Sequence, residues 1–93
     1  MTEREIIRLL AQRYVKMIGL GKDQHLRNMC LTIIDKYDTY PEGKLNRWLG
    51  YIQRAVIDMK LTTLPKESRF TRPLFDKLYM AQQPTEQPTP PNE

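Results

Sequence analysis

The longest periodic stretch of the chain lies between Thr39 and Met59. Apolar side chains recur there every three or four residues, at Leu45, Trp48, Leu49, Ile52, Ala55, Val56 and Met59. This spacing places them on one face of an α-helix. The opposite side is mostly cationic and polar, with Lys44, Arg47, Tyr51, Arg54 and Asp58. We therefore expect a helix that turns Trp48 toward a core and presents a basic outer face.

Two shorter helical repeats precede this stretch. The first is expected to begin at Thr2, because Thr2 and Glu5 have the Thr-x-x-Glu spacing of a capping box. Gly19 and Gly21 are expected to end it, since glycine suits the left-handed residue that follows many helices. The second repeat follows Asp23, a typical N-cap residue. Its apolar positions are Leu26, Met29, Cys30, Ile33, Ile34 and Tyr37.

Helix-start signals occur at two later points. Thr39 and Glu42 form a second capping-box pattern, with Pro41 in the first turn and Gly43 delaying the start of the third helix by a residue or two. Thr71 is expected to cap a short fourth helix with Pro73 in its first turn. That helix would offer its apolar side chains to the core, namely Leu74, Phe75, Leu78 and Tyr79.

From residue 82 to residue 93 the chain has four prolines and no large apolar side chain. Such a composition cannot offset the entropy of ordering, so we expect a disordered tail. The expected fold class is all-α: one small bundle of three main helices plus a short fourth helix over residues 1–81, followed by this tail.

The net charge of the chain is +4. Since the tail carries two acids and no base, residues 1–81 carry a net charge of +6. This excess favours anionic partners, or it serves solubility alone. No apolar run approaches the ~18 residues that span a bilayer, and no signal peptide is visible. We expect a cytoplasmic protein without contact with a membrane.

The single Cys and single His make an intrachain disulfide impossible and a metal site unexpected. The acids are scattered over expected helix ends, and no phosphate loop or catalytic triad pattern is present. We therefore expect neither catalysis nor a cofactor. An enzyme that uses His25 and Cys30 is the least favoured alternative, because Cys30 falls within an apolar stripe.

The candidate binding residues of the third helix surround Gly50. Basic groups with an aromatic between them contact phosphate and stack on bases, as Lys44, Arg47, Tyr51 and Arg54 would. A glycine inside a helix costs about 1 kcal/mol relative to alanine. Two explanations for Gly50 remain open, a tight helix crossing and the floor of a ligand site. Asn46 and Gln53 would supply directed hydrogen bonds in either case.

A second candidate site surrounds the expected start of the fourth helix. Arg69 and Arg72 flank this helix N-terminus, which already favours anions. A cation in the first turn opposes the helix dipole, which indicates an outside partner, an acid elsewhere in the fold, or a mild penalty.

The segments Lys44–Gln53, KLNRWLGYIQ, and Arg69–Phe75, RFTRPLF, resemble small accessory proteins encoded by tailed bacteriophages. Those proteins are similar in an R-W-L-G-aromatic-aliphatic-Q helix and a downstream F-T-R-P segment, and the resemblance covers residues 24–79. It implies a bacteriophage protein that is present in a bacterial host cell. Since many small helical phage proteins block or sequester host defence components, it also raises the prior for such a role.

Two functions of different class follow. The first is a non-catalytic inhibitor of a host defence system that binds a host protein. The alternative is a nucleotide or nucleic-acid binder, which includes sequestration of a cyclic-nucleotide signal. In either case a domain of this size could complete its core as a homo-oligomer.

Overall fold

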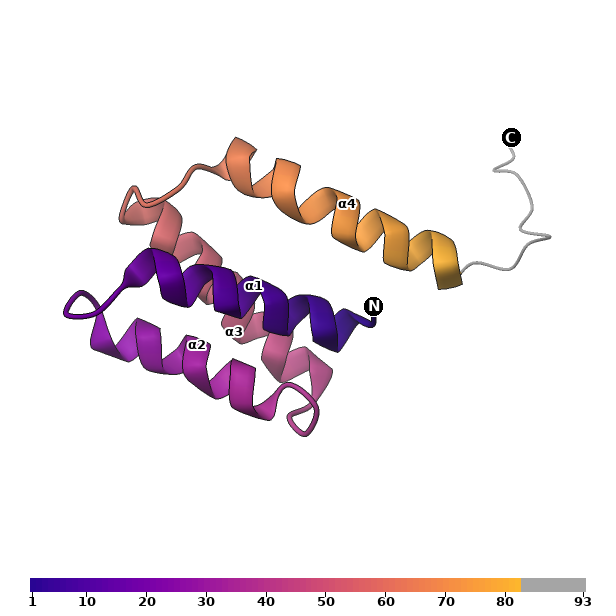
Figure 1. The fold of residues 1–93 in the computed structure, drawn as a ribbon, viewed down its shortest axis with the longest axis horizontal. Coiled ribbons are helices and arrows are strands. Elements are labelled where there is room, and N and C mark those ends of the chain that lie inside the picture. Colours follow the sequence, from indigo (N-terminus) through magenta and orange to yellow (C-terminus); the bar gives the residue numbers. More distant parts are fainter. Residues whose placement is uncertain (83–93) are drawn as a thin grey trace.

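The computed structural model describes residues 1–82, which form four helices and no strand (Figure 1). They are α1 (Glu3–Ile18), α2 (Gln24–Lys36), α3 (Glu42–Asp58) and α4 (Leu64–Gln82). The all-α expectation is confirmed. Of the expected tail, residues 83–93 lie outside the described residues.

The caps predicted for α1 and α2 are present. The Thr2 hydroxyl accepts from the Glu5 N–H at 3.1 Å, and the Thr2 N–H donates to Glu5 Oε1 at 2.8 Å, which is a complete capping box. Gly19 ends α1 with φ 70° and ψ −178°, a conformation that only glycine adopts without strain. Asp23 caps α2 by accepting from the Leu26 N–H at 3.0 Å.

The capping box predicted for α3 is wrong. Pro41 is the N-cap and makes no side-chain cap bond, while the Thr39 hydroxyl donates back to the Lys36 carbonyl. The helix begins at Glu42, so Gly43 does not delay it. The connection is instead held by Arg4 of α1, whose Nη1 donates to the carbonyls of Tyr37 and Tyr40 at 2.9 and 2.6 Å. The Tyr37 and Tyr40 carbonyls are thus satisfied by an arginine of α1, while no described side chain caps the N–H groups of the first turn of α3.

The fourth helix is not short. It has 19 residues, begins at Leu64 and contains Pro73 in its interior. Thr63 precedes the helix and accepts from the Lys66 N–H at 3.3 Å. Thr71 is not a cap, because its hydroxyl donates to the Glu67 carbonyl one turn back. The Thr-x-Pro pattern therefore occurs here within a helix, at a proline that is exposed to solvent.

The hydrophobic core is formed mainly by α1, α2 and α3. Buried apolar side chains come from α1 (Ile6, Ile7, Leu10, Ala11, Tyr14, Ile18), α2 (Leu26, Cys30, Ile33) and α3 (Leu45, Leu49, Ile52, Val56). Trp48 is half-buried against this core, as its periodicity predicted. In Figure 1, α4 lies along α1 on the outside of the other three helices. The outer side of α3 is consequently left to solvent.

Candidate binding surface

The outer face of α3 consists of the residues on the side opposite the core. Beyond the first turn of the helix, its exposed members are Asn46, Arg47, Gly50, Tyr51, Arg54 and Asp58. They are exposed because Leu45, Leu49, Ile52 and Val56 turn the other side of the helix inward. Tyr51 in the middle of this face is 56% exposed. The periodicity of the sequence therefore placed the basic residues on the correct side.

Among residues 1–82, no other helix crosses α3 at Gly50. A methyl group at this position would meet no atom within 4 Å. Gly50 instead lines a shallow hollow of about 460 Å³ together with Gln53, Arg54, Ile57, Asp58 and Leu64. A crossing of α3 at Gly50 by another of the described helices of this chain is therefore excluded. Within the described chain, the cost of a glycine in this helix is not offset by any close packing.

Arg47 and Arg54 lie one turn before and one turn after Gly50. Both are exposed, and neither forms an ion pair with another of the described residues. Arg54 shares the hollow with Asp58, so the charge on that side is mixed. Arg47 and Arg54 remain available to an anion from outside.

Three other predicted site residues already have partners within the chain. Lys44 Nζ lies over the ring of Tyr40 at 4.2 Å and at 5.5 Å from the ring centre of Trp48. The Asn46 amide donates to Glu3 Oε2 and to the Glu42 carbonyl, each at 3.1 Å. Lys44 and Asn46 therefore help to join α3 to its surroundings.

The third, Gln53, lies between the hollow and the interior. It lines the hollow, and its Nε2 donates to the hydroxyl of Tyr14 in α1 at 3.0 Å. A ligand in the hollow would therefore meet a side chain that is already oriented by α1.

Arg69 and Arg72 lie on the exposed side of α4. With Ser68 and Pro73 they line a separate hollow of about 280 Å³. Because α4 begins at Leu64, neither arginine is near the helix N-terminus. The expected conflict between Arg72 and the helix dipole is therefore wrong. No ion pair joins either arginine to an acid within residues 1–80.

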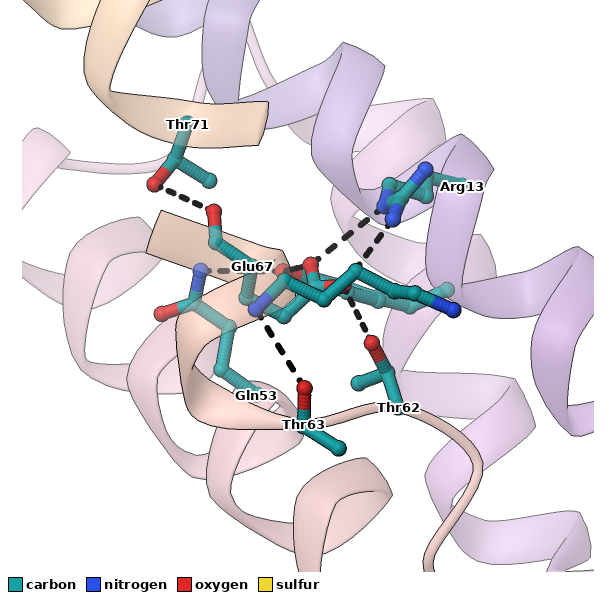
Figure 2. Close-up of polar contacts among 8 residues, drawn as sticks. Arg13, Gln53, Thr62, Thr63, Glu67 and Thr71 are labelled. Atoms are coloured by element: carbon teal, nitrogen blue, oxygen red, sulfur yellow. Dashed lines mark hydrogen bonds and ion pairs between the residues drawn. The ribbon is translucent and has the colours of Figure 1, made fainter. Parts of the chain in front are cut away.

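The main polar contact of the interior was not predicted from the sequence. The Glu67 residue in α4 is only 3% exposed, and its carboxylate accepts from two residues of α1 (Figure 2). Arg13 donates from Nε and Nη2 at 3.3 and 3.0 Å, and the Tyr14 hydroxyl donates at 2.6 Å. The Thr62 hydroxyl, from the α3–α4 connection, donates at 2.7 Å. We call this set, Arg13, Tyr14, Thr62 and Glu67, the Glu67 clasp.

The ionisation of the clasp follows from these contacts. Burial by itself would raise the pKa of Glu67, but the hydrogen bonds from Arg13, Tyr14 and Thr62 outweigh it, and the pKa is lowered. Burial also raises the pKa of the Tyr14 phenol, and its bond to the Glu67 carboxylate adds to this effect. Glu67 is thus an anion and Tyr14 a neutral donor at neutral pH.

The sequence contains one signal that would have indicated the clasp. Glu67, Thr71, Leu74 and Leu78 share the inner side of one helical repeat, and this repeat continues through Pro73. Glu67 occupies the first inward position. A charged residue at such a position needs a buried partner, but only the packing of α4 on α1 identifies Arg13.

Neither protein-family models nor curated proteins nor solved structures gave a match to this chain.

The other reactive or metal-binding side chains of the described residues do not form a catalytic or metal site. Cys30 is fully buried, and burial raises the pKa of its thiol to about 11. His25 is exposed in the first turn of α2, so Cys30 and His25 do not face each other. In the described part of the chain, no group of three or more metal-binding side chains is present. None of these helices has the length and apolar content needed to cross a membrane.

Proposed function

We propose that this protein acts by binding and that its ligand is an anionic nucleotide or nucleic acid held on the outer face of α3. The observation that carries the proposal is the open space at Gly50. This space lies between Arg47 and Arg54 along one helix face, with Tyr51 next to it. The chain retains a destabilising glycine where only an outside molecule would use the room it leaves.

Each group of this face suits one part of such a ligand. Arg47 and Arg54 form no ion pair with another described residue, and guanidinium groups bind phosphate oxygens in a fork geometry. The exposed ring of Tyr51 offers a stacking surface for a base. Gly50 allows a sugar or base to approach the helix backbone. Arg69 and Arg72 on α4 add to the positive field that attracts an anion.

The proposal is tested by filling the space at Gly50. The Gly50→Leu variant would be titrated with mononucleotides, cyclic dinucleotides and single-stranded oligonucleotides, at low and at physiological salt. We expect wild-type protein to bind at least one of these ligands, more weakly as salt rises. Gly50→Leu should weaken that binding at least tenfold.

Gly43 offers a matched control on the same helix. It is also exposed, and a methyl group there would also meet no atom within 4 Å. Gly43→Leu should change the affinity less than twofold. If wild-type protein binds none of these ligands, or if the two leucine variants bind equally well, the proposal is wrong.

A second candidate is supported by the apolar side chains that α4 exposes. Leu64, Tyr79 and Met80 are 64%, 53% and 74% exposed. Exposed apolar groups of this kind suit a protein partner or self-association. Together with the resemblance to phage accessory proteins, they support an inhibitor that binds a host defence protein. If the protein bound and sequestered a nucleotide signal of the host defence, it would be both a nucleotide binder and an inhibitor.

The two candidates predict opposite effects of the same variants. Affinity capture from bacterial lysate should recover a specific protein with wild-type chain and with Gly50→Leu, but not with Tyr79→Ser and Met80→Ser combined. Recovery of no specific protein would count against the inhibitor. Light scattering on purified wild-type protein and on the combined Tyr79→Ser and Met80→Ser variant would show whether the apolar side chains of α4 support a homo-oligomer.

A further inference from the structure

The helix α4 contributes little to the hydrophobic core. Among residues 1–80, Leu78 is its one buried apolar side chain, while Leu74 and Phe75 are half-buried. Its contacts are chiefly with α1, along the outside of the other three helices (Figure 1). The core of α1, α2 and α3 is therefore nearly complete without α4.

The attachment of α4 near its start is polar rather than apolar. The Glu67 clasp lies in the first turns of α4 and joins it to α1 and to the preceding connection. Glu67 is the one charged residue that is buried in the described chain. Such a contact is directional, and its carboxylate and donors are all well solvated by water once they separate.

Next to the clasp, Arg13 also stacks on Phe70. The guanidinium carbon lies 4.0 Å from the centre of the Phe70 ring, which is 37% exposed. Beside this pair is a hollow of about 370 Å³ between α1 and α4, lined by Leu9, Gln12, Arg13, Lys16, Met17 and Phe70. The two helices are thus incompletely packed beside the point where the clasp holds them.

The connection between α3 and α4 has the features of a hinge. It comprises five residues between Asp58 and Leu64. Bonds from the Lys60 and Leu61 N–H groups to the Ile57 and Val56 carbonyls end α3 in a Schellman motif. Lys60 has φ 63°, a left-handed conformation that costs a residue other than glycine about 1–2 kcal/mol. Rotation at Lys60 relieves this strain, which offsets part of the cost of breaking the two Schellman hydrogen bonds.

We propose that α4 moves away from α1 and back as a unit by rotation at residues 59–63. The Glu67 clasp holds α4 in the closed position against α1. In the closed position Leu64 forms part of the hollow at Gly50, and Gln53 is oriented by Tyr14, a member of the clasp. Opening removes Leu64 from that hollow and uncovers Leu9 and Met17 of α1. The opening itself does not depend on which ligand, if any, binds α3.

Hydrogen exchange of the full chain, followed by mass spectrometry, tests the proposal. Peptides from α4 should exchange with one common rate, at least tenfold faster than peptides from the buried parts of α2 and α3. Glu67→Gln should speed exchange in α4 at least a further tenfold. Exchange in α2 and α3 requires global unfolding, which also breaks the clasp, so it should rise by no more than the same factor and stay slower than in α4. Asp76→Asn, an exposed acid of the same helix, should leave α4 unchanged.

A milder variant covers the case in which Glu67→Gln does not fold. Thr62→Val removes one donor of the clasp and keeps the ion pair with Arg13, so exchange in α4 should rise about threefold. The proposal is overturned if α4 in wild-type protein exchanges as slowly as α2 and α3. It is also overturned if Glu67→Gln and Thr62→Val leave exchange in α4 as slow as in wild type.

Discussion

The replacement of Glu67 by glutamine should strongly reduce the stability of the protein. Glutamine has nearly the same shape, but it places an amide NH2 where one carboxylate oxygen was. In the structure that oxygen, Oε2, accepts from Arg13 Nη2 at 3.0 Å and from the Thr62 hydroxyl at 2.7 Å. After the change, the Thr62 hydroxyl can rotate to accept from the amide, but Arg13 Nη2 meets another donor and loses its counter-ion.

The size of the effect follows from these contacts. A hydrogen bond to a charged group is worth about 1.5–3 kcal/mol. Breaking a fully buried ion pair costs about 3–5 kcal/mol. The side chain of Arg13 is 25% exposed, so water replaces part of what it loses. We therefore expect the free energy of unfolding to fall by about 2–3 kcal/mol, which lowers the Tm of a domain of this size by roughly 10–20 °C.

Urea unfolding followed by circular dichroism at 222 nm would measure this loss. Asp76→Asn is the matched control, since it removes one negative charge from an exposed position of the same helix. It should change the free energy of unfolding by less than about 0.5 kcal/mol. If Glu67→Gln proves as mild as this control, the clasp does not hold α4, and the reasoning from its geometry is refuted.

Three further predictions concern acid, the hinge and the buried thiol. Because the pKa of Glu67 is lowered in the folded protein, its contribution to stability is present above its ordinary value of 4.5 and lost as the pH falls below it; urea midpoints measured between pH 7 and pH 3 should fall more in wild type than in Glu67→Gln, which keeps the part due to Glu5, whose pKa is lowered by its hydrogen bond with the Thr2 N–H. Lys60→Gly should stabilise the fold by about 0.5–1 kcal/mol and Lys60→Val should destabilise it by about 1 kcal/mol, because valine adopts positive φ least readily; equal denaturation midpoints for the two variants would contradict this. Cys30, whose pKa is raised to about 11, should react with a thiol reagent at pH 7.5 only as fast as the protein opens; rapid labelling without denaturant would show that the thiol is accessible.

The first two helices followed from the sequence because their signals are local. The Thr2–Glu5 box and the Asp23 cap each involve residues three apart, so the sequence already contains both partners. The outward direction of Arg47, Tyr51 and Arg54 followed equally from helical periodicity. Their role in binding stays a prediction.

The errors arose where a distant residue replaced a local one. Arg4 of α1 donates to the Tyr37 and Tyr40 carbonyls before α3, whereas the Thr39 hydroxyl donates to the Lys36 carbonyl and does not cap the helix. Pro73 resembled the first turn of a helix, but it lies within α4, where its missing N–H removes the intrahelical bond to the Arg69 carbonyl. The Glu67 clasp joins residues more than 50 positions apart, and no sequence spacing predicts that contact.

The position of Trp48 decides what a fluorescence experiment on this protein will report. Its ring meets Tyr40 edge-on, with centroids 6.0 Å apart, and Lys44 lies above it. These neighbours belong to the α2–α3 loop and to α3, so indole emission reports the unfolding of this loop and of α3. Far-ultraviolet ellipticity, in contrast, reports the total helix content of all four helices. If α4 detaches first, the ellipticity midpoint will precede the emission midpoint, and an unlabelled protein will reveal a step that a single probe would miss.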